Sequence, residues 1–183
     1  MTALYRNVRP VFILVVIMWL IEAVSWSSGH ALVRFGIEPR TPSGLIGIFT
    51  APFLHGSLVH MASNTIPMLV LGALVAVSGA GRLVGVTIVT AVIGGLGVWA
   101  FGRAAMHVGA SILIFGYFGF LVANAYYERS AQAIIFALLT LGLYAGLIWG
   151  VLPTQAGVSW EGHLFGFIGG VISARIKRPR RRR

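Results

Sequence analysis

The stretch GASILIFG, residues 109–116, decides how the rest of the chain is interpreted. It places one serine, Ser111, at the head of a long apolar segment, with small residues before it and an aromatic residue and a glycine after it. A serine in a membrane helix most often serves as a polar contact between helices. It acts as a nucleophile when a base lies beside it. The other polar residues of the chain must decide between these two interpretations.

The composition is typical of a membrane protein. Of 183 residues, 57% are hydrophobic and only 10% are charged, whereas a soluble domain is about half apolar and a quarter charged. A helical span needs about 20 mostly apolar residues. Six apolar segments meet this description closely enough to predict spans: residues 11–26, 58–77, 83–101, 110–127, 131–151 and 162–176.

The predicted fold class is therefore all-α, a bundle of six transmembrane helices. The membrane domain covers residues 11–176, after a short N-terminal segment at 1–10 and before a basic tail at 177–183. Residues 27–49 are predicted to be a loop, because glycine and proline recur there. In the fifth segment, glycines four residues apart predict a close packing seam: Gly142, Gly146 and Gly150.

Charge predicts the orientation. With both termini in the cytoplasm, the inner side holds four arginines of the N-terminal segment and inner loops and seven basic residues from Arg175 to the C-terminus, and the outer side holds three arginines. Basic residues favour the cytoplasmic side, so the prediction is a multi-pass protein of the plasma membrane with both ends inside. A basic tail beside a span indicates contact with anionic lipid of the bilayer rather than with nucleic acid.

Several chemistries are excluded by residues that the chain lacks. Without cysteine it has no disulfide, thiolate nucleophile or thiolate metal site, and without aspartate it has no serine–histidine–aspartate triad. His55 and His60 are five residues apart with no acid nearby, which does not fit a metal site. We therefore predict no metal and no cofactor. A small transporter is a weaker alternative, because internal repeats and charged core residues are lacking.

For two further polar side chains, Glu22 and His107, we predict no catalytic role. Glu22, near the end of the first apolar segment, is expected to pair with a loop donor such as His30 or Arg34. His107 lies near Arg103 in the loop at residues 102–108 and is expected to be solvated.

Polar residues of three segments gather at one predicted depth. In the predicted topology Ser111, His163 and the pair His60 and Asn64 all begin helices that enter from the outer side. His60 and Asn64 are four apart and share a helix face. Polar residues inside a membrane are costly and mark functional sites. Their convergence favours a nucleophilic serine over a packing contact.

The last apolar segment offers the base. Gly166 and Gly170 share a face with His163, and without side chains they allow a neighbouring helix to approach closely. If that neighbour is the segment 110–127, His163 can take the proton of Ser111. Backbone N–H groups at the start of a helix are free, and together with His60 and Asn64 they could stabilise an oxyanion.

These motifs resemble those of the rhomboid family of intramembrane serine proteases, over essentially the whole chain. Three blocks carry the resemblance: His55-x4-His60-x3-Asn64, Gly109-x-Ser111 with Phe115 and Gly116, and Gly162-His163-x2-Gly166-x3-Gly170. Their order and spacing together match a compact bacterial member with six spans.

The resemblance implies a role for each matched residue. Ser111 would be the nucleophile and His163 the general base, with Phe115 packed on the histidine. His60, Asn64 and the Ser111 backbone N–H would form the oxyanion hole, and His55, Gly109, Gly166 and Gly170 would support the site. Substrates of the family are single-span membrane proteins that are cut near the outer face, and its fifth span and following loop act as gate and cap.

One residue departs from the family pattern. Ile112 follows the serine where the family usually has glycine, so its β-branched side chain is expected to crowd the substrate backbone. The alternative function is therefore a rhomboid-like protein that binds transmembrane clients without cutting them.

Overall fold

The computed structural model describes residues 2–153 and 157–176, and within these ranges the regular structure is helical apart from one isolated bridge between Ile37 and His107. This agrees with the all-α prediction. The basic tail at 177–183 and part of the predicted cap, at 154–156, lie outside the described residues. The elements are α1 (Ala3–Ser27), η1 (Ala31–Phe35), α2 (Gly44–Thr50), η2 (Ala51–Phe53), α3 (Leu58–Val77), α4 (Ala80–Phe101), α5 (Ser111–Glu128), α6 (Ala131–Tyr144), η3 (Ala145–Val151) and α7 (Trp160–Ile176).

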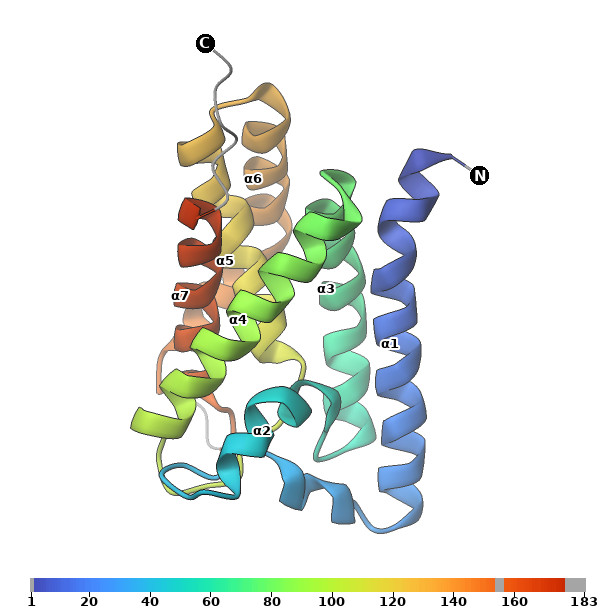
Figure 1. Ribbon diagram of the computed structural model, residues 1–183, viewed down its shortest axis with the longest axis vertical. Helices are drawn as coiled ribbons and strands as arrows, with labels where there is room; N and C mark the ends of the chain where they lie inside the picture. Colours follow the sequence, from blue (N-terminus) through green and yellow to red (C-terminus); the bar gives the residue numbers. More distant parts are fainter. Residues whose placement is uncertain (1, 154–156, 177–183) are drawn as a thin grey trace.

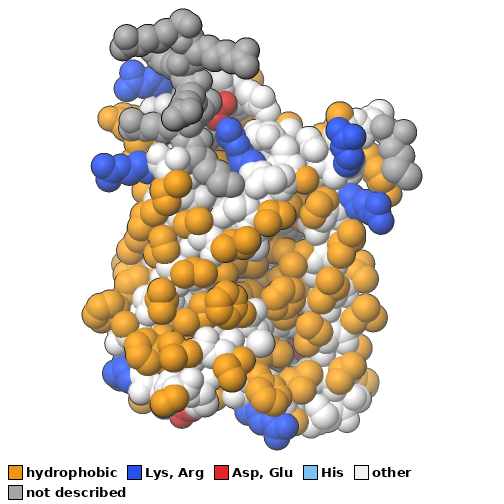
Figure 2. Space-filling view, viewed as in Figure 1, with side chains coloured by type: hydrophobic (Ala, Val, Ile, Leu, Met, Phe, Trp, Pro, Cys, Tyr) orange, Lys and Arg blue, Asp and Glu red, His pale blue; other side chains and the backbone are white. Residues whose placement is uncertain are grey.

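Four helical stretches are long and apolar enough to cross a membrane: α1, α3, α4, and α6 continued by η3. The other two predicted spans correspond to α5 and α7, which have 18 and 17 residues. On the face that Figure 2 shows, a broad apolar belt crosses the bundle, and arginine side chains gather toward its two ends. This is the surface expected of a protein that lies in a bilayer.

Helix α5 forms the centre of the bundle. Its residues 112–121 are all buried, and it packs against α3, α4, α6 and α7 (Figure 1). Its closest partner is α7: a Cβ at Gly170 would strike the carbonyl oxygen of Gly116, and one at Gly166 would strike the carbonyl oxygen of Ile112. These glycines let the two backbones touch, which fixes the relative position of the helix that begins at Ser111 and the helix that carries His163.

The predicted seam in the fifth apolar segment is wrong at Gly142 and Gly146, and only Gly150 packs closely, where a Cβ would lie 2.7 Å from the Phe115 ring. Among the described residues, nothing lies within 4 Å of a Cβ built at Gly142 or Gly146. Helix α6 instead buries a stripe of other small side chains, Ala133, Ala137 and Thr140. The spacing of the glycines defined a helix face, but it did not determine whether another helix covers that face. The α-helix also ends at Tyr144 and continues as the 3₁₀ segment η3.

The long loop predicted at residues 27–49 is partly helical. It contains η1 and α2, and Figure 1 shows α2 beside α4 at the end of the bundle opposite the N-terminus. The glycines that suggested a loop serve close packing here: a Cβ at Gly47 would strike the backbone of Gly36, and one at Gly95 of α4 would lie 2.8 Å from Ile48.

The remaining differences concern helix α1. It begins at Ala3 rather than at residue 11, with Thr2 as its cap and Pro10 inside it. The expected partner of Glu22 is confirmed: its carboxylate is fully buried and lies 3.2 Å from the His30 ring.

Candidate active site

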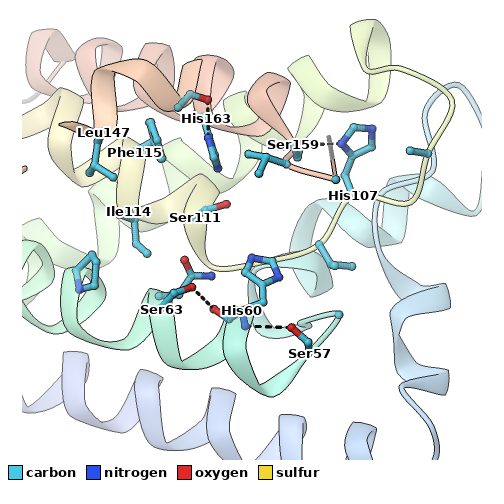
Figure 3. Close-up of a pocket in the computed structure, with 18 of the residues that line it drawn as sticks. Ser57, His60, Ser63, His107, Ser111, Ile114, Phe115, Leu147, Ser159 and His163 are labelled. Carbon is cyan, nitrogen blue, oxygen red and sulfur yellow. Dashed lines mark hydrogen bonds between the residues drawn. The ribbon is translucent and has the colours of Figure 1, made fainter. Parts of the chain in front are cut away.

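A cavity of about 1220 Å³ lies between α3, α5, η3 and α7. Side chains from separate elements meet there, and Figure 3 shows His163, Ser111 and His60 following one another across it, from α7 through α5 to α3. Five of the residues that the sequence singled out line it: Ser111, His163, His60, Asn64 and Phe115. The polar groups expected at one depth therefore face one common space. His55, Gly109, Gly166 and Gly170 lie behind its walls.

Ser111 is the first residue of α5, and the turn before it is held from two sides. The Gly109 N–H donates to the Ala51 carbonyl at 2.9 Å, and the Ala110 N–H donates to Nε2 of His55 at 3.2 Å. Gly109 has φ +123°, and a Cβ there would lie 2.8 Å from the His60 ring, so only glycine fits. The turn presents Ser111 to the cavity.

His55 is in the neutral state that it needs to accept the Ala110 N–H. It is fully buried, and its ring stands edge-on to His60 with centroids 5.0 Å apart. Burial, with the neighbouring His60, lowers the pKa of His55 to about 3. The imidazole is therefore neutral at physiological pH, and its Nε2 keeps the lone pair that accepts the Ala110 N–H.

His163 is held in one orientation and one tautomer. Phe115 stacks on its ring with centroids 3.9 Å apart and planes 6° from parallel. Its Nδ1 lies 2.8 Å from the carbonyl oxygen of Gly150 in η3. A carbonyl can only accept, so Nδ1 carries the proton, and the Nε2 of the neutral ring has a free lone pair. This is the state that a general base requires.

Asn64 brings an unpaired donor to the cavity. Helix α3 is capped by Ser57, whose hydroxyl accepts the His60 N–H at 3.1 Å, and Asn64 follows one turn later. The Asn64 side-chain NH2 is buried and has no hydrogen-bond partner among the described residues. An unsatisfied buried donor is costly, and such groups call for an explanation such as a catalytic role.

Ile112 does not crowd the cavity. Its side chain is buried against α4, where it lies 2.9 Å from a Cβ built at Gly94, and it is absent from the residues that line the cavity. In a helix, adjacent residues point about 100° apart, so the residue after Ser111 faces a different neighbour. This position gives the expectation of crowding no support.

Sequence reasoning missed a second group of polar residues at the cavity wall. His107 is only 4% exposed rather than solvated, and the Ser159 hydroxyl lies 2.6 Å from its Nδ1. Arg103 donates its backbone N–H to Glu161 at 3.1 Å. Ser159 could have been noticed as a cap, because serine before an apolar run typically begins a helix. In residues 2–153 and 157–176, His and Glu nowhere form a group of three that could hold a metal ion.

Comparison with known proteins gives a family. The sequence model of the rhomboid domain matches residues 42–180. The chain is 38% identical over 169 residues to a protein of Mycobacterium tuberculosis (strain ATCC 25618 / H37Rv) that is named only as uncharacterized, covering 87% of this chain and 70% of the relative. It is 37% identical over 167 residues to a similarly named protein of Mycobacterium leprae (strain TN), covering 86% and 66%.

Proposed function

Because the chain belongs to the rhomboid family, whose members are in general intramembrane serine proteases, we propose that it is a serine endopeptidase that cuts transmembrane segments of membrane proteins. Ser111 is the nucleophile and His163 the general base. The observation that supports this assignment best is the state of His163: its Nδ1–H is used by Gly150, and its ring faces the cavity that Ser111 also lines.

The reaction uses the groups of the cavity in sequence. Nε2 of His163 takes the proton of the Ser111 hydroxyl while the serine oxygen attacks the scissile carbonyl carbon. The resulting imidazolium then gives that proton to the leaving amine as the peptide bond breaks, which leaves an acyl ester on Ser111. A water molecule, deprotonated by the same nitrogen, hydrolyses the ester and restores both side chains.

The negative charge that forms on the carbonyl oxygen needs donors. The Asn64 NH2 has no hydrogen-bond partner among the described residues, and Asn64 lines the cavity from α3. The His60 ring and the backbone N–H of Ser111 complete the oxyanion hole. Removing one such donor typically costs about 100- to 1,000-fold in kcat.

We infer that all six helices, α1 and α3 to α7, cross the plasma membrane and that both termini are cytoplasmic. This places most basic residues inside. Arg34, Arg40 and Arg103 then mark the outer end, and the cavity extends to this end because Val33 and Arg103 line it. Substrates are accordingly cut near the outer face, and no metal or cofactor takes part.

A substrate would enter the cavity from the side that η3 forms. Gly146, Leu147, Trp149 and Gly150 line the cavity from it, yet Gly146 has open space where a Cβ would be. The part of this wall around Gly146 is not tightly packed and can be displaced at little cost, whereas Gly150 stays in place because its carbonyl accepts the Nδ1–H of His163. The alternative of a client-binding protein without activity depended on crowding by Ile112, and with that side chain turned toward α4 no observation favours it.

A fluorophosphonate probe tests the proposal on the purified chain in detergent. We expect one covalent adduct per chain on Ser111, none in Ser111→Ala, and much slower labelling in His163→Ala. Ser78→Ala, at the far end of α3 from the cavity, is the control and should label like the parent. Labelling that persists in Ser111→Ala, or that is absent from a folded parent chain, would contradict the proposal.

A further inference from the structure

A hydrogen bond joins the two segments that carry the proposed catalytic residues. His107 precedes Ser111 by four residues, and Ser159 precedes His163 by four. The Ser159 hydroxyl and Nδ1 of His107 are 2.6 Å apart, and Figure 3 shows this contact at the edge of the cavity. The bond thus lies at the same distance along the chain from each catalytic side chain.

The direction of this bond follows from its neighbours. Nε2 of His107 lies 3.1 Å from the Arg103 carbonyl, which can only accept, so Nε2 carries the proton. Nδ1 is then an acceptor, and the Ser159 hydroxyl donates to it. The Ser159 oxygen in turn accepts the Gly162 N–H at 3.2 Å. The hydroxyl is therefore engaged both as donor and as acceptor.

Backbone hydrogen bonds hold both residues of this bond, His107 and Ser159, in place. On one side, the backbone N–H and carbonyl of His107 are both bonded to Ile37, at 3.0 and 2.9 Å. On the other side, Ser159 caps α7, and its carbonyl accepts the N–H of His163 at 3.2 Å. A shift of Ser159 would therefore move the backbone of His163.

A second set of contacts supports the same connection. The Arg103 backbone N–H donates to Glu161 at 3.1 Å, and its guanidinium donates to the Val158 carbonyl at 2.5 Å. Glu161 is buried. The loop before α5 is thereby bonded to Val158, Ser159 and Glu161, at the start of α7.

The fold needs such a connection at this level. Helices α5 and α7 touch backbone to backbone where Gly166 meets Ile112, and Phe115 stacks on the His163 ring. These contacts hold the two helices from Ile112 and His163 onward, whereas the segments that precede the helices border the cavity and are joined by the bond between His107 and Ser159. A reacting pair that is misplaced by 1 Å can lose about 100-fold in rate.

We propose that His107 and Ser159 are positioning residues, whose hydrogen bond sets the separation between Ser111 and His163. The inference rests on the proposed function. Ser159 is not a second nucleophile in this account, because its oxygen is held by the N–H of its own helix and its hydroxyl by His107. The two residues act through the segments they join and do not touch the substrate.

A double-mutant cycle tests this proposal. The rates of fluorophosphonate labelling and the kcat and KM for a transmembrane peptide are measured for the parent chain, His107→Ala, Ser159→Ala and the double variant. We expect each single variant to label about 10- to 100-fold more slowly, with kcat lowered and KM little changed. The double variant should be no slower than the slower single one, because both remove the same bond.

Two controls separate positioning from stability. Ser130→Ala removes a helix cap of the same kind, since Ser130 accepts the Ala133 N–H at 3.1 Å, but it joins no catalytic segments; it should lower the unfolding temperature without slowing labelling. His107→Asn keeps an acceptor near the position of Nδ1 and should recover most of the lost rate.

The outcomes distinguish this inference from the proposed function. Independent effects that multiply in the double variant, parent-like labelling in both single variants, or an adduct on Ser159 would each overturn the positioning role while Ser111 remains the labelled nucleophile of the parent. A folded parent chain that is not labelled at all would overturn both.

Discussion

Helices α6 and α7 carry the same sequence signal and use it in opposite ways. Helix α7 has Gly166 and Gly170, and α6 continued by η3 has Gly142, Gly146 and Gly150, with neighbouring glycines four residues apart in each apolar segment. In α7, a Cβ at Gly166 or Gly170 would strike the backbone of α5, whereas Gly142 of α6 has open space among the described residues. Figure 1 shows α7 and α5 side by side. A glycine pattern therefore shows where a close approach is permitted, and only the partner helix decides whether it occurs.

The difference matches the two tasks that we propose for these helices. Helix α7 holds the general base at a fixed place beside α5, and backbone contact gives the shortest and stiffest connection between two helices. Helix α6 and the start of η3, before Gly150, form the wall that a substrate must displace. Only the short stripe of Ala133, Ala137 and Thr140 is buried on α6, which leaves little packing to break.

The largest contrast is expected between Gly170→Ala and Gly142→Ala. One methyl group at Gly170 meets the carbonyl of Gly116 and the backbone of Phe120, atoms that cannot rotate away, so we expect a loss of at least about 3 kcal/mol or a failure to fold. At Gly142 the methyl enters open space, and alanine favours a helix over glycine by about 1 kcal/mol. Thermal unfolding in detergent measures both. Equal unfolding temperatures would show that the two helices are not packed differently.

A smaller effect, on activity rather than folding, is expected at Gly150. A Cβ there would lie 2.7 Å from the Phe115 ring and 3.1 Å from Nδ1 of His163. In Gly150→Ala, η3 must retreat, which stretches the 2.8 Å bond that fixes the tautomer of His163. We expect labelling at least about tenfold slower, a loss of about 1.4 kcal/mol, with little change in unfolding temperature.

The matched control is again Gly142→Ala, which lies on α6 away from the cavity and should keep the parent rate. Parent-like labelling in Gly150→Ala would mean that η3 does not hold the base. A lower rate that is restored by a higher pH would point instead to a changed pKa of His163.

The residues of the candidate site could be predicted where side chains carry the signal. Ser111, His163, His60 and Asn64 are conspicuous because each is polar within an apolar segment. The distribution of basic residues predicts the orientation of the spans, and in that orientation all four residues lie near the outer side of the membrane. The partner of Glu22 could be predicted for the same reason, since a lone acid in such a segment needs a donor.

What could not be predicted mostly involves the backbone. The carbonyls of Ala51 and Gly150 place the serine turn and the histidine, but every residue has a carbonyl, so the sequence does not mark those two. His55 also acts on a backbone group, the Ala110 N–H. His107 was misjudged because it lies in a short loop that also contains Arg103, whereas its partner Ser159 lies 52 residues away.

The smallest effect is expected from Thr140→Val, on the one buried stripe of α6. Thr140 is fully buried, and its hydroxyl has no hydrogen-bond partner among the described residues. Valine has the same shape without the unpaired hydroxyl, so the variant should unfold at the parent temperature or above it, by up to about 1 kcal/mol, and should label at the parent rate. Thr140→Ser, which keeps the hydroxyl and loses a methyl group, should be less stable than the parent. If Thr140→Val were the less stable variant, the hydroxyl would have a partner and α6 would be held by more than contact between small side chains, which would weaken its contrast with α7.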